Sequence, residues 1–142
     1  MLKLKVAETS LEKEQAFDVR RRVFTDEQGV SPDIEFDEWD KTAVHFIGYN
    51  LQQPIAAGRL RIIEQGIGKA ERICVLPEFR GHGIGAMMMT EAEEYARTQK
   101  LHIVRLNAQV HALPFYENLG YTTVSEEFLS AGIPHKTMEK TL

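Results

Sequence analysis

Residues 73–85 read ICVLPEFRGHGIG, and much of the architecture of this chain follows from them. The first four residues are apolar, as in a buried strand, and a proline closes that run. After the glycines, apolar residues recur at steps of three and four, which is the spacing of an amphipathic helix. A strand, a glycine-rich turn and a helix in this order leave unpaired backbone N–H groups at the helix start, where they favour a phosphate. The stretch therefore predicts a phosphate-binding turn between a strand at 70–76 and a helix at 86–98.

The residues of the turn indicate a receptacle for a pyrophosphate-bearing ligand. Gly81, Gly83 and Gly85 have no Cβ, so a ligand can approach the main chain closely and a positive φ is accessible. Arg80 adds a permanent cation in a planar fork that suits phosphate oxygens. His82 lies inside the same turn, where its side chain either faces the ligand or points to water. We expect backbone N–H groups of this turn to hold the ligand.

The composition is that of an ordinary globular protein. The 142 residues are 43% hydrophobic and 27% charged, which fits a single domain spanning residues 1–142. The formal net charge of -4 gives no basic face of the kind that nucleic-acid binding needs. No apolar run has the length of a membrane span or of a signal-peptide core. We therefore expect no nucleic-acid partner and no membrane partner.

The numbers and spacing of cysteines and histidines indicate the cellular compartment and whether a metal site is expected. Cys74 is the only cysteine, which excludes an internal disulfide and fits a reducing cytoplasm. Its apolar neighbours indicate a packed thiol and not a nucleophile. The five histidines show no metal-ligand spacing. We expect a cytoplasmic protein that uses no metal.

Strand, turn and helix signals along the rest of the chain predict the fold class. Thr9-Ser10-Leu11-Glu12 has the pattern of a capping box, which predicts a helix that ends near Gly29, followed by a loop at 30–41. The other predicted elements are strands at 1–6, 43–51, 55–63, 102–108, 121–127 and 135–140, and a short helix at 112–118. This order predicts an α+β domain with a mixed, mostly antiparallel central sheet and helices on both faces.

Two motifs resemble those of the GNAT N-acetyltransferase superfamily. Its acetyl-CoA signature has Arg or Gln, two arbitrary residues, Gly, one residue, and then Gly or Ala. Arg80, Gly83 and Gly85 fill the fixed places of that signature. Residues 115–121, FYENLGY, are similar to the superfamily's tyrosine-bearing helix and its Gly-aromatic turn. The resemblance implies the GNAT acyl-CoA N-acyltransferase fold, acetyl-CoA as co-substrate and an amine as acceptor.

Further segments resemble the ElaA-type subgroup of that superfamily. They are Val23-Phe24 followed by Glu27-Gln28, Asp37–Asp40, and Gly132-Ile133-Pro134-His135 with Met138. Thr25-Asp26 stand where an apolar pair is expected before Glu27. The resemblance spans residues 2–140 and is compatible with a homodimer.

The resemblance also implies roles for residues beside the turn. The strand edge at 73–75 pairs with the pantetheine arm of CoA and diverges from the strand at 102–108, which opens a slot between them. A backbone N–H near Val75 then stabilises the developing oxyanion. Asn107, at its strand end, either hydrogen-bonds the amide-rich arm or caps the strand. The expected CoA-binding residues are Ile73, Cys74, Val75, Arg80, Gly81, His82, Gly83, Ile84, Gly85, Asn107 and Tyr116.

Tyr116 is the candidate acid that protonates the departing CoA thiolate. A phenol with an ordinary pKa of about 10 is protonated at neutral pH and can donate to a basic sulfur. Helical periodicity alone would make Tyr116 an aromatic residue that packs on Phe115 and Leu119. The family resemblance favours the catalytic role.

The base that deprotonates the amine has several candidates. His135 is the catalytic candidate, because the ordinary pKa of histidine, near 6.5, suits this task and the residue belongs to the subgroup match. Glu71 is expected to share a strand face with Ile73 and Val75, by simple alternation. The remaining candidates, acting directly or through a water, are Glu27, Asp40 and His111.

The function expected is an acetyl-CoA-dependent N-acetyltransferase that acts on a primary amine of a small molecule or a protein. The alternative is a non-catalytic acyl-CoA-binding sensor or scaffold module, against which Tyr116 and the intact glycine turn argue. A nucleotide-hydrolysing P-loop fits poorly, because no Gly-Lys-Ser/Thr ends the turn. A Rossmann dinucleotide site also fits poorly, because regular β-α-β alternation is lacking.

Overall fold

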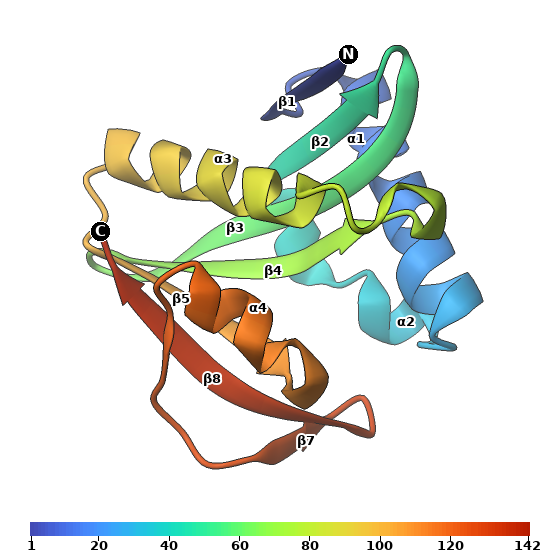
Figure 1. The fold of residues 1–142 in the computed structure, drawn as a ribbon. Helices are drawn as coiled ribbons and strands as arrows, with labels where there is room; N and C mark the ends of the chain where they lie inside the picture. Colours follow the sequence, from blue (N-terminus) through green and yellow to red (C-terminus); the bar gives the residue numbers. More distant parts are fainter.

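The computed structural model describes residues 1–142 as an eight-stranded sheet with helices packed against it (Figure 1). The strands are β1 (Leu2–Val6), β2 (Val44–Asn50), β3 (Gln53–Glu64), β4 (Ile67–Val75), β5 (Ile103–Gln109), β6 (Thr122–Thr123), β7 (Phe128–Ser130) and β8 (Ile133–Thr141). The α-helices are α1 (Ser10–Arg20), α2 (Pro32–Glu35), α3 (Ile84–Thr98) and α4 (Leu113–Asn118). A π-helical segment, η1 (Arg21–Glu27), extends α1, and short 3₁₀ helices are η2 (Glu38–Lys41), η3 (Pro77–Phe79) and η4 (Val110–Ala112).

The sheet is mixed and mostly antiparallel, as predicted. Its strand order is β1-β2-β3-β4-β5-β8-β6, and β7 also pairs with β8. Strands β1 to β4 form an antiparallel meander, and β8 runs antiparallel to β5, β6 and β7. Only β4 and β5 are parallel neighbours, and α3 provides the crossover connection that a parallel pair requires. The predicted α+β class is therefore confirmed.

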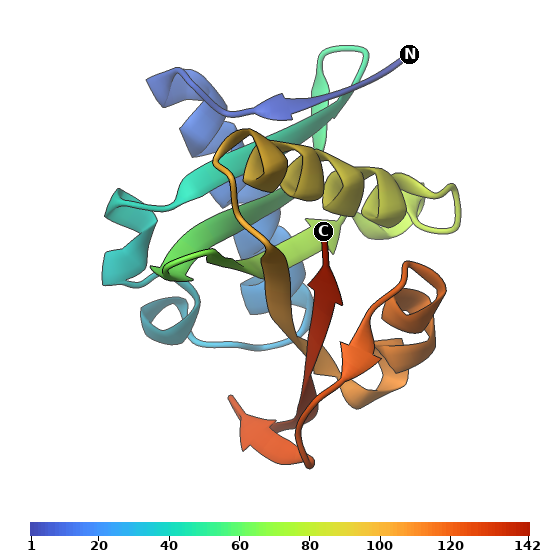
Figure 2. The ribbon, with the colours of Figure 1, turned by 90° about the vertical axis from the view of Figure 1, so that its left-hand side faces the viewer.

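Helices cover both faces of the sheet (Figure 2). Helix α1 packs on β2, β3 and β4 from one side, and α3 packs on β3 and β4 from the other. Neighbouring residues of β2 show the two faces, since Phe46 belongs to the core under α3 and Ile47 to the core under α1. None of the helices combines the length and the apolar character that crossing a bilayer requires.

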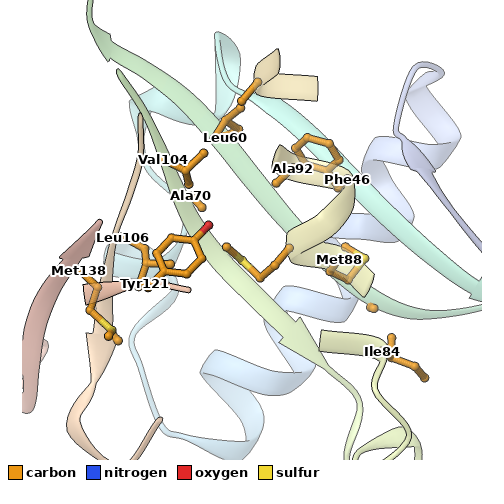
Figure 3. Close-up of a cluster of buried hydrophobic side chains, with 14 of the residues drawn as sticks. Phe46, Leu60, Ala70, Ile84, Met88, Ala92, Val104, Leu106, Tyr121 and Met138 are labelled. Atoms are coloured by element: carbon orange, nitrogen blue, oxygen red, sulfur yellow. The ribbon is translucent and has the colours of Figure 1, made fainter. Parts of the chain in front are cut away.

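The larger core lies between α3 and the sheet (Figure 3). Met88 and Ala92 of α3 belong to the same cluster as Leu60 of β3, and all three are fully or almost fully buried. Tyr121 is also buried there, and its hydroxyl donates a hydrogen bond to the carboxylate of Glu93 at 2.8 Å. This packing fixes α3 on the sheet, and with it the turn that precedes the helix.

Helix α1 begins where the capping box predicts and ends differently from a regular helix. The Thr9 hydroxyl accepts a hydrogen bond from the Glu12 N–H, and the Glu12 carboxylate accepts one from the Thr9 N–H, each at 3.1 Å. After Arg20 the chain continues as the π-helical segment η1. Gly29, with a φ of +76°, follows the segment. The predicted helix end near Gly29 therefore agrees with the structure, although its last seven helical residues are π-helical.

Two segments differ from the sequence prediction. The predicted loop at 30–41 contains α2 and η2, whose first turns are capped by the side chains of Ser31 and Asp37. The predicted strand at 121–127 is reduced to β6, because the Ser125 hydroxyl accepts the Thr137 N–H at 2.8 Å and replaces a ladder bond to β8. Strand β7 then forms where the prediction had none.

Candidate functional site

A cavity of about 700 Å³ opens where β4 and β5 separate. The parallel pairing of these strands ends at Ala70 and Leu106. Beyond that point the cavity is lined by β4 on one side and by Asn107 and Gln109 of β5 on the other. The expected divergence of the two strands is therefore present, and it opens the slot.

Strand β4 carries a bulge beside the slot. The register with β3 slips by one residue, so that Gly58 of β3 faces both Arg72 and Ile73. Arg72 has a φ of +61°, in the left-handed region that costs a non-glycine residue about 1–2 kcal/mol. A Cβ at Gly58 would overlap Cδ1 of Ile73, so glycine there makes room for the Ile73 side chain in its present position.

The bulge shows that the predicted strand face of Glu71 was wrong. Simple alternation placed Glu71 on the face of Ile73 and Val75, but the extra residue reverses the alternation between them. Ile73 and Val75 pack against the core under α3. The Glu71 carboxylate instead accepts hydrogen bonds from Nε of Arg59 at 3.1 Å and from Nε of Arg61 at 2.6 Å. Glu71 does not line the cavity.

The main chain of Val75 faces the slot. The Leu76 N–H donates to the Ile55 carbonyl at 2.9 Å, and Cys74 belongs to the same ladder with β3. Main-chain groups of successive strand residues point in opposite directions. The N–H and C=O of Val75 and the C=O of Ile73 therefore point away from β3, toward β5. The Val75 C=O accepts from Nε of Arg80 at 2.9 Å, which leaves the Val75 N–H and the Ile73 C=O for a ligand.

The glycine-rich turn presents a row of free N–H groups. Gly81 and Gly83 have φ values of +83° and +78°, and α3 begins at Ile84. None of the N–H groups of residues 81–86 donates a hydrogen bond to a protein atom. The positive end of the dipole of the 15-residue helix α3 lies at the same place. Together these groups form an anion-binding concavity.

The guanidinium of Arg80 already has protein partners. Its Nε donates to the Val75 carbonyl at 2.9 Å, and its two Nη atoms donate to the two carboxylate oxygens of Glu27, each at 2.7 Å. The hydrogen bonds from Arg80 lower the pKa of Glu27. Because the Arg80 charge is paired in this way, the backbone N–H groups are the remaining anion donors of the turn. The contact also brings the end of η1 to the turn.

The other predicted turn residues lie in different surroundings. His82 is exposed and is the predicted residue that does not line the cavity. Ile84 is buried in the core under α3. Gly85 leaves room for the ring of Phe115, which lies 3.3 Å from where a Cβ would be. The thiol of Cys74 is buried under α1, and burial raises its pKa to about 12, so that it stays protonated.

Tyr116 and Asn107 both line the cavity. The Tyr116 ring contacts Phe115 and Tyr121 edge-on, with ring centroids 4.9 and 5.9 Å apart. Its hydroxyl has no hydrogen-bond partner in the protein, and burial raises the pKa of Tyr116 to about 12. Asn107 accepts a hydrogen bond from the Thr137 hydroxyl at 2.8 Å through Oδ1, which leaves its amide N–H groups free.

Two histidines line the cavity, each with one nitrogen held by the protein. His135 Nδ1 lies 2.6 Å from the Ile133 carbonyl, which can only accept, so Nδ1 carries the proton and Nε2 a lone pair. The Gln109 amide N–H donates to Gln28 at 3.3 Å, and Gln109 Oε1 lies 2.6 Å from His111 Nε2. His111 therefore donates through Nε2 and keeps its lone pair on Nδ1.

The acidic residues that were candidates for the base lie outside the cavity. Asp40 accepts hydrogen bonds from Nη1 of Arg20 at 2.7 Å and from Nη1 of Arg59 at 2.8 Å, within an ion network on the α1 face of the sheet. Glu71 belongs to that network, and Glu27 is paired with Arg80. None of the three carboxylates lines the cavity. Among the predicted bases, the structure thus places only the two histidines there.

Sequence reasoning missed several residues of the cavity wall. Arg72 carried no signal, because a bulge with a left-handed residue leaves no trace in side-chain periodicity. Gln109 directly follows the predicted strand at 102–108, and extending that strand by one residue would have found it. Other residues of the wall that the sequence did not single out for the site are Phe24, Gln28, Val30, Ile34 and Ala131.

Known proteins with related sequences and folds identify the family of this chain. The model of the acetyltransferase (GNAT) domain family matches residues 9–142. A relative from Bacillus subtilis (strain 168), the uncharacterized N-acetyltransferase YjcF, is 41% identical over 140 residues, covering 98% of this chain and 99% of its own length.

Two solved structures show the same fold. Escherichia coli ElaA superposes with a TM-score of 0.88 at 23% identity, covering 99% of both chains. A GNAT family acetyltransferase from Elizabethkingia anophelis with acetyl-CoA bound superposes with a TM-score of 0.77 at 13% identity, covering 99% of this chain and 98% of its own. The divergent strands, the glycine turn before the long helix and these matches agree. The chain therefore belongs to the GNAT family and is an N-acetyltransferase.

Proposed function

We propose that this chain transfers an acetyl group from acetyl-CoA to a primary amine of a small molecule or a protein. One observation carries the proposal: the N–H groups of residues 81–86, at the start of α3, have no acceptor within the protein. Such a row at a helix N-terminus suits the diphosphate of CoA. The acetyl-CoA bound to the E. anophelis structure supports the same assignment.

The slot fits the remainder of the donor. The C=O of Ile73 faces away from β3, as the edge of a strand that a pantetheine arm extends, and the Val75 N–H next to it is left for the thioester. Across the slot, the free amide N–H groups of Asn107 are suited to a pantetheine carbonyl. Tyr116 lines the same cavity and keeps its hydroxyl free. We infer that the donor lies between these residues with its thioester beside Tyr116.

The proposed chemistry is direct attack of the amine. Acetyl-CoA supplies a thioester carbonyl carbon as the electrophile and a thiolate as the leaving group. The Val75 N–H donates to the carbonyl oxygen as negative charge develops on it. His135 accepts the proton of the attacking amine at Nε2, with His111 Nδ1 as the second candidate. The Tyr116 hydroxyl gives its proton to the departing sulfur.

Release of free CoA thiol from acetyl-CoA, measured over a panel of primary amines, tests the proposal. We expect thiol release that depends on the amine and yields the acetylated product by mass spectrometry. The alternative function, a sensor or scaffold that binds acyl-CoA without turnover, predicts binding and no amine-dependent release. Amine-dependent release would rule out that alternative, and its absence across the panel would rule out the enzyme.

We further propose that residues 1–142 act as one catalytic domain in the cytoplasm. The cavity draws its wall from α2, β4, α4 and β8, so that both halves of the chain complete it. The single cysteine is free and buried, which suits a reducing compartment.

A further inference from the structure

One part of the cavity wall is apolar and belongs to none of the donor-binding elements. Phe24 of η1, Val30, and Ile34 of α2 form one side of it. Ala131 and Ile133, at the turn from β7 to β8, also line the cavity. An apolar wall of this kind favours ligands that bring apolar surface to it, since burying that surface is the main gain on binding.

The charged groups of the same wall are already compensated. The Glu35 carboxylate is 2% exposed and pairs with Nε of Arg20 at 2.8 Å and with Nε of Arg72 at 2.9 Å. The Arg72 guanidinium also donates to the carbonyls of Ile34 and Glu35, each at 3.2 Å. Because Glu35 is buried and shared by two arginines, it is not a partner for a second ammonium group on a ligand.

Apart from the paired charges, the polar side chains of the cavity include two imidazoles and two glutamine amides. His135 Nε2 and His111 Nδ1 carry lone pairs, and Gln28, the residue after η1, accepts a hydrogen bond from Gln109 of β5 at 3.3 Å. Each of these lone pairs can accept a hydrogen bond from one amino group. The wall has no set of carboxylates that would hold several cationic groups in fixed positions.

From this apolar wall and its paired charges we infer that the acceptor is a monoamine with an apolar alkyl or aryl body. The inference rests on the proposed function and narrows its acceptor. Polyamines and clusters of lysine side chains are disfavoured, because Ile34 and Phe24 offer a second ammonium group no hydrogen-bond acceptor and gain nothing from contact with it.

A matched pair of ligands tests the inference by binding. Hexylamine and 1,6-diaminohexane have the same chain length and differ in one terminal amino group. Calorimetry with the full chain, both free and saturated with CoA, is expected to give a dissociation constant for hexylamine at least tenfold below that for the diamine. Equal affinities, or tighter binding of the diamine, would overturn the inference.

Substitution of Ile34 adds a second, independent readout. Ile34 is 53% exposed and lines the cavity, so Ile34→Glu adds a carboxylate to the wall without emptying a core. We expect this variant to reverse the preference toward 1,6-diaminohexane by tenfold or more. Leu11→Glu is the matched control, because Leu11 is 62% exposed on α1 and does not line the cavity. An unchanged preference in Ile34→Glu would contradict the placement of the acceptor.

The same ligands separate this inference from the proposed function. Thiol release from acetyl-CoA with either amine reports catalysis, whereas calorimetry reports the acceptor wall alone. Preferential binding of hexylamine, with no thiol release from any amine of the panel, would uphold the wall's preference for an apolar monoamine and refute the transferase. Thiol release that is faster with the diamine would uphold the transferase and refute the acceptor inference.

Discussion

The hydroxyl of Tyr116 offers the sharpest test at the scale of a single residue. Burial raises the pKa of Tyr116 to about 12, so the phenol keeps its proton through neutral and moderately alkaline pH. Tyr116→Phe removes that proton and very little packing surface. We expect kcat to fall by about 100-fold or more, the low end of what a general acid contributes, with the acetyl-CoA dissociation constant unchanged. Steady-state kinetics and calorimetry on the same preparation measure the two quantities.

Tyr95→Phe provides the control for this variant. Tyr95 packs on Phe46 under α3, with ring centroids 6.0 Å apart, and does not line the cavity. We expect it to leave kcat unchanged. An unaltered kcat in Tyr116→Phe would assign Tyr116 to packing on Phe115 and Tyr121. The high pKa also predicts that wild-type kcat shows no loss attributable to Tyr116 below about pH 10.

At the scale of elements, the turn before α3 depends on its left-handed glycines. A Cβ at Gly83 would meet no atom within 4 Å, so the cost of Gly83→Ala comes from its φ of +78° and not from a clash. We expect a loss of about 1–2 kcal/mol in the free energy of unfolding. The acetyl-CoA dissociation constant should rise at least tenfold, because the strain turns the N–H groups away from a common ligand. Urea unfolding and calorimetry measure the two effects.

Gly132→Ala separates strain from binding. Gly132 has a φ of +76° and equally open surroundings, in the turn between β7 and β8. We expect the same loss of stability with an unchanged acetyl-CoA dissociation constant. If Gly83→Ala and Gly132→Ala behave alike in both measurements, the turn does not hold the diphosphate.

The bulge in β4 makes a second element-scale prediction. Gly58→Ala would press a methyl group onto Cδ1 of Ile73, and overpacking of this kind costs about 1–3 kcal/mol. Because Ile73 borders the slot, we also expect kcat/KM to fall by tenfold or more. Gly48→Ala is the control, since its Cβ would lie 3.1 Å from Cβ of Ala56, outside the cavity wall. Lost stability with intact kcat/KM in Gly58→Ala would separate the bulge from catalysis.

Side-chain patterns predicted the elements well and their irregularities poorly. The capping box at Thr9 placed the start of α1 correctly, because cap and helix are adjacent in sequence. The bulge at Arg72 was invisible, because it depends on the register between two strands. The shortening of β6 was invisible for the same kind of reason, since Ser125 takes a main-chain donor from a strand twelve residues away. Local signals predict local structure, whereas interruptions of a sheet depend on its partner strands.

At the scale of the whole molecule, a buried ion network ties the N-terminal third to the sheet. Arg20 and Arg59 are 0% and 1% exposed. They share Asp40, and Arg72 adds Glu35 and Asp37 from the segment that contains α2. Breaking such a network leaves an unpaired buried charge, so it fixes how α1 and α2 meet β3 and β4. The acceptor side of the cavity is built on that junction.

The network predicts a loss of stability in acid. Burial raises the pKa of Asp40, but hydrogen bonds and charge from Arg20 and Arg59 outweigh it and hold the pKa at about 2. Since this lies below the ordinary value of 3.8, the contribution is fully present above that value and is lost as the pH falls through about 2. The pKa values of Asp37 and Glu71 are lowered as well, so both add to the loss of stability in acid. Burial raises the pKa of Glu35, and its contribution to the pH dependence has the opposite sign.

Urea unfolding at pH 5, 4, 3 and 2.5 measures this dependence. We expect the free energy of unfolding to fall steadily from pH 4 downward. Asp40→Asn should be less stable at pH 5 and should show a shallower fall. A wild-type free energy that stays constant from pH 5 to pH 2.5 would show that the network does not stabilise the fold.

The residues of the donor side could be predicted from the sequence more completely than those of the acceptor side. Residues 80–85 form one contiguous turn, so their motif could be recognised from the sequence alone. The acceptor wall draws Ile34 from α2 and Ile133 from β8, which no spacing rule relates. The candidate base shows the same limit, because only the structure separates the histidines in the cavity from Asp40 and Glu71 in the ion network.

The proposed function depends on the main-chain N–H groups before α3, which we propose hold the diphosphate of the coenzyme. Calorimetric titration of the wild-type chain with acetyl-CoA and with acetyl-pantetheine, which lacks the diphosphate, tests it most directly. We expect saturable binding of acetyl-CoA with an affinity at least 100-fold higher than that of acetyl-pantetheine. Equal affinities for the two donors, or no binding of acetyl-CoA by the folded protein, would contradict it.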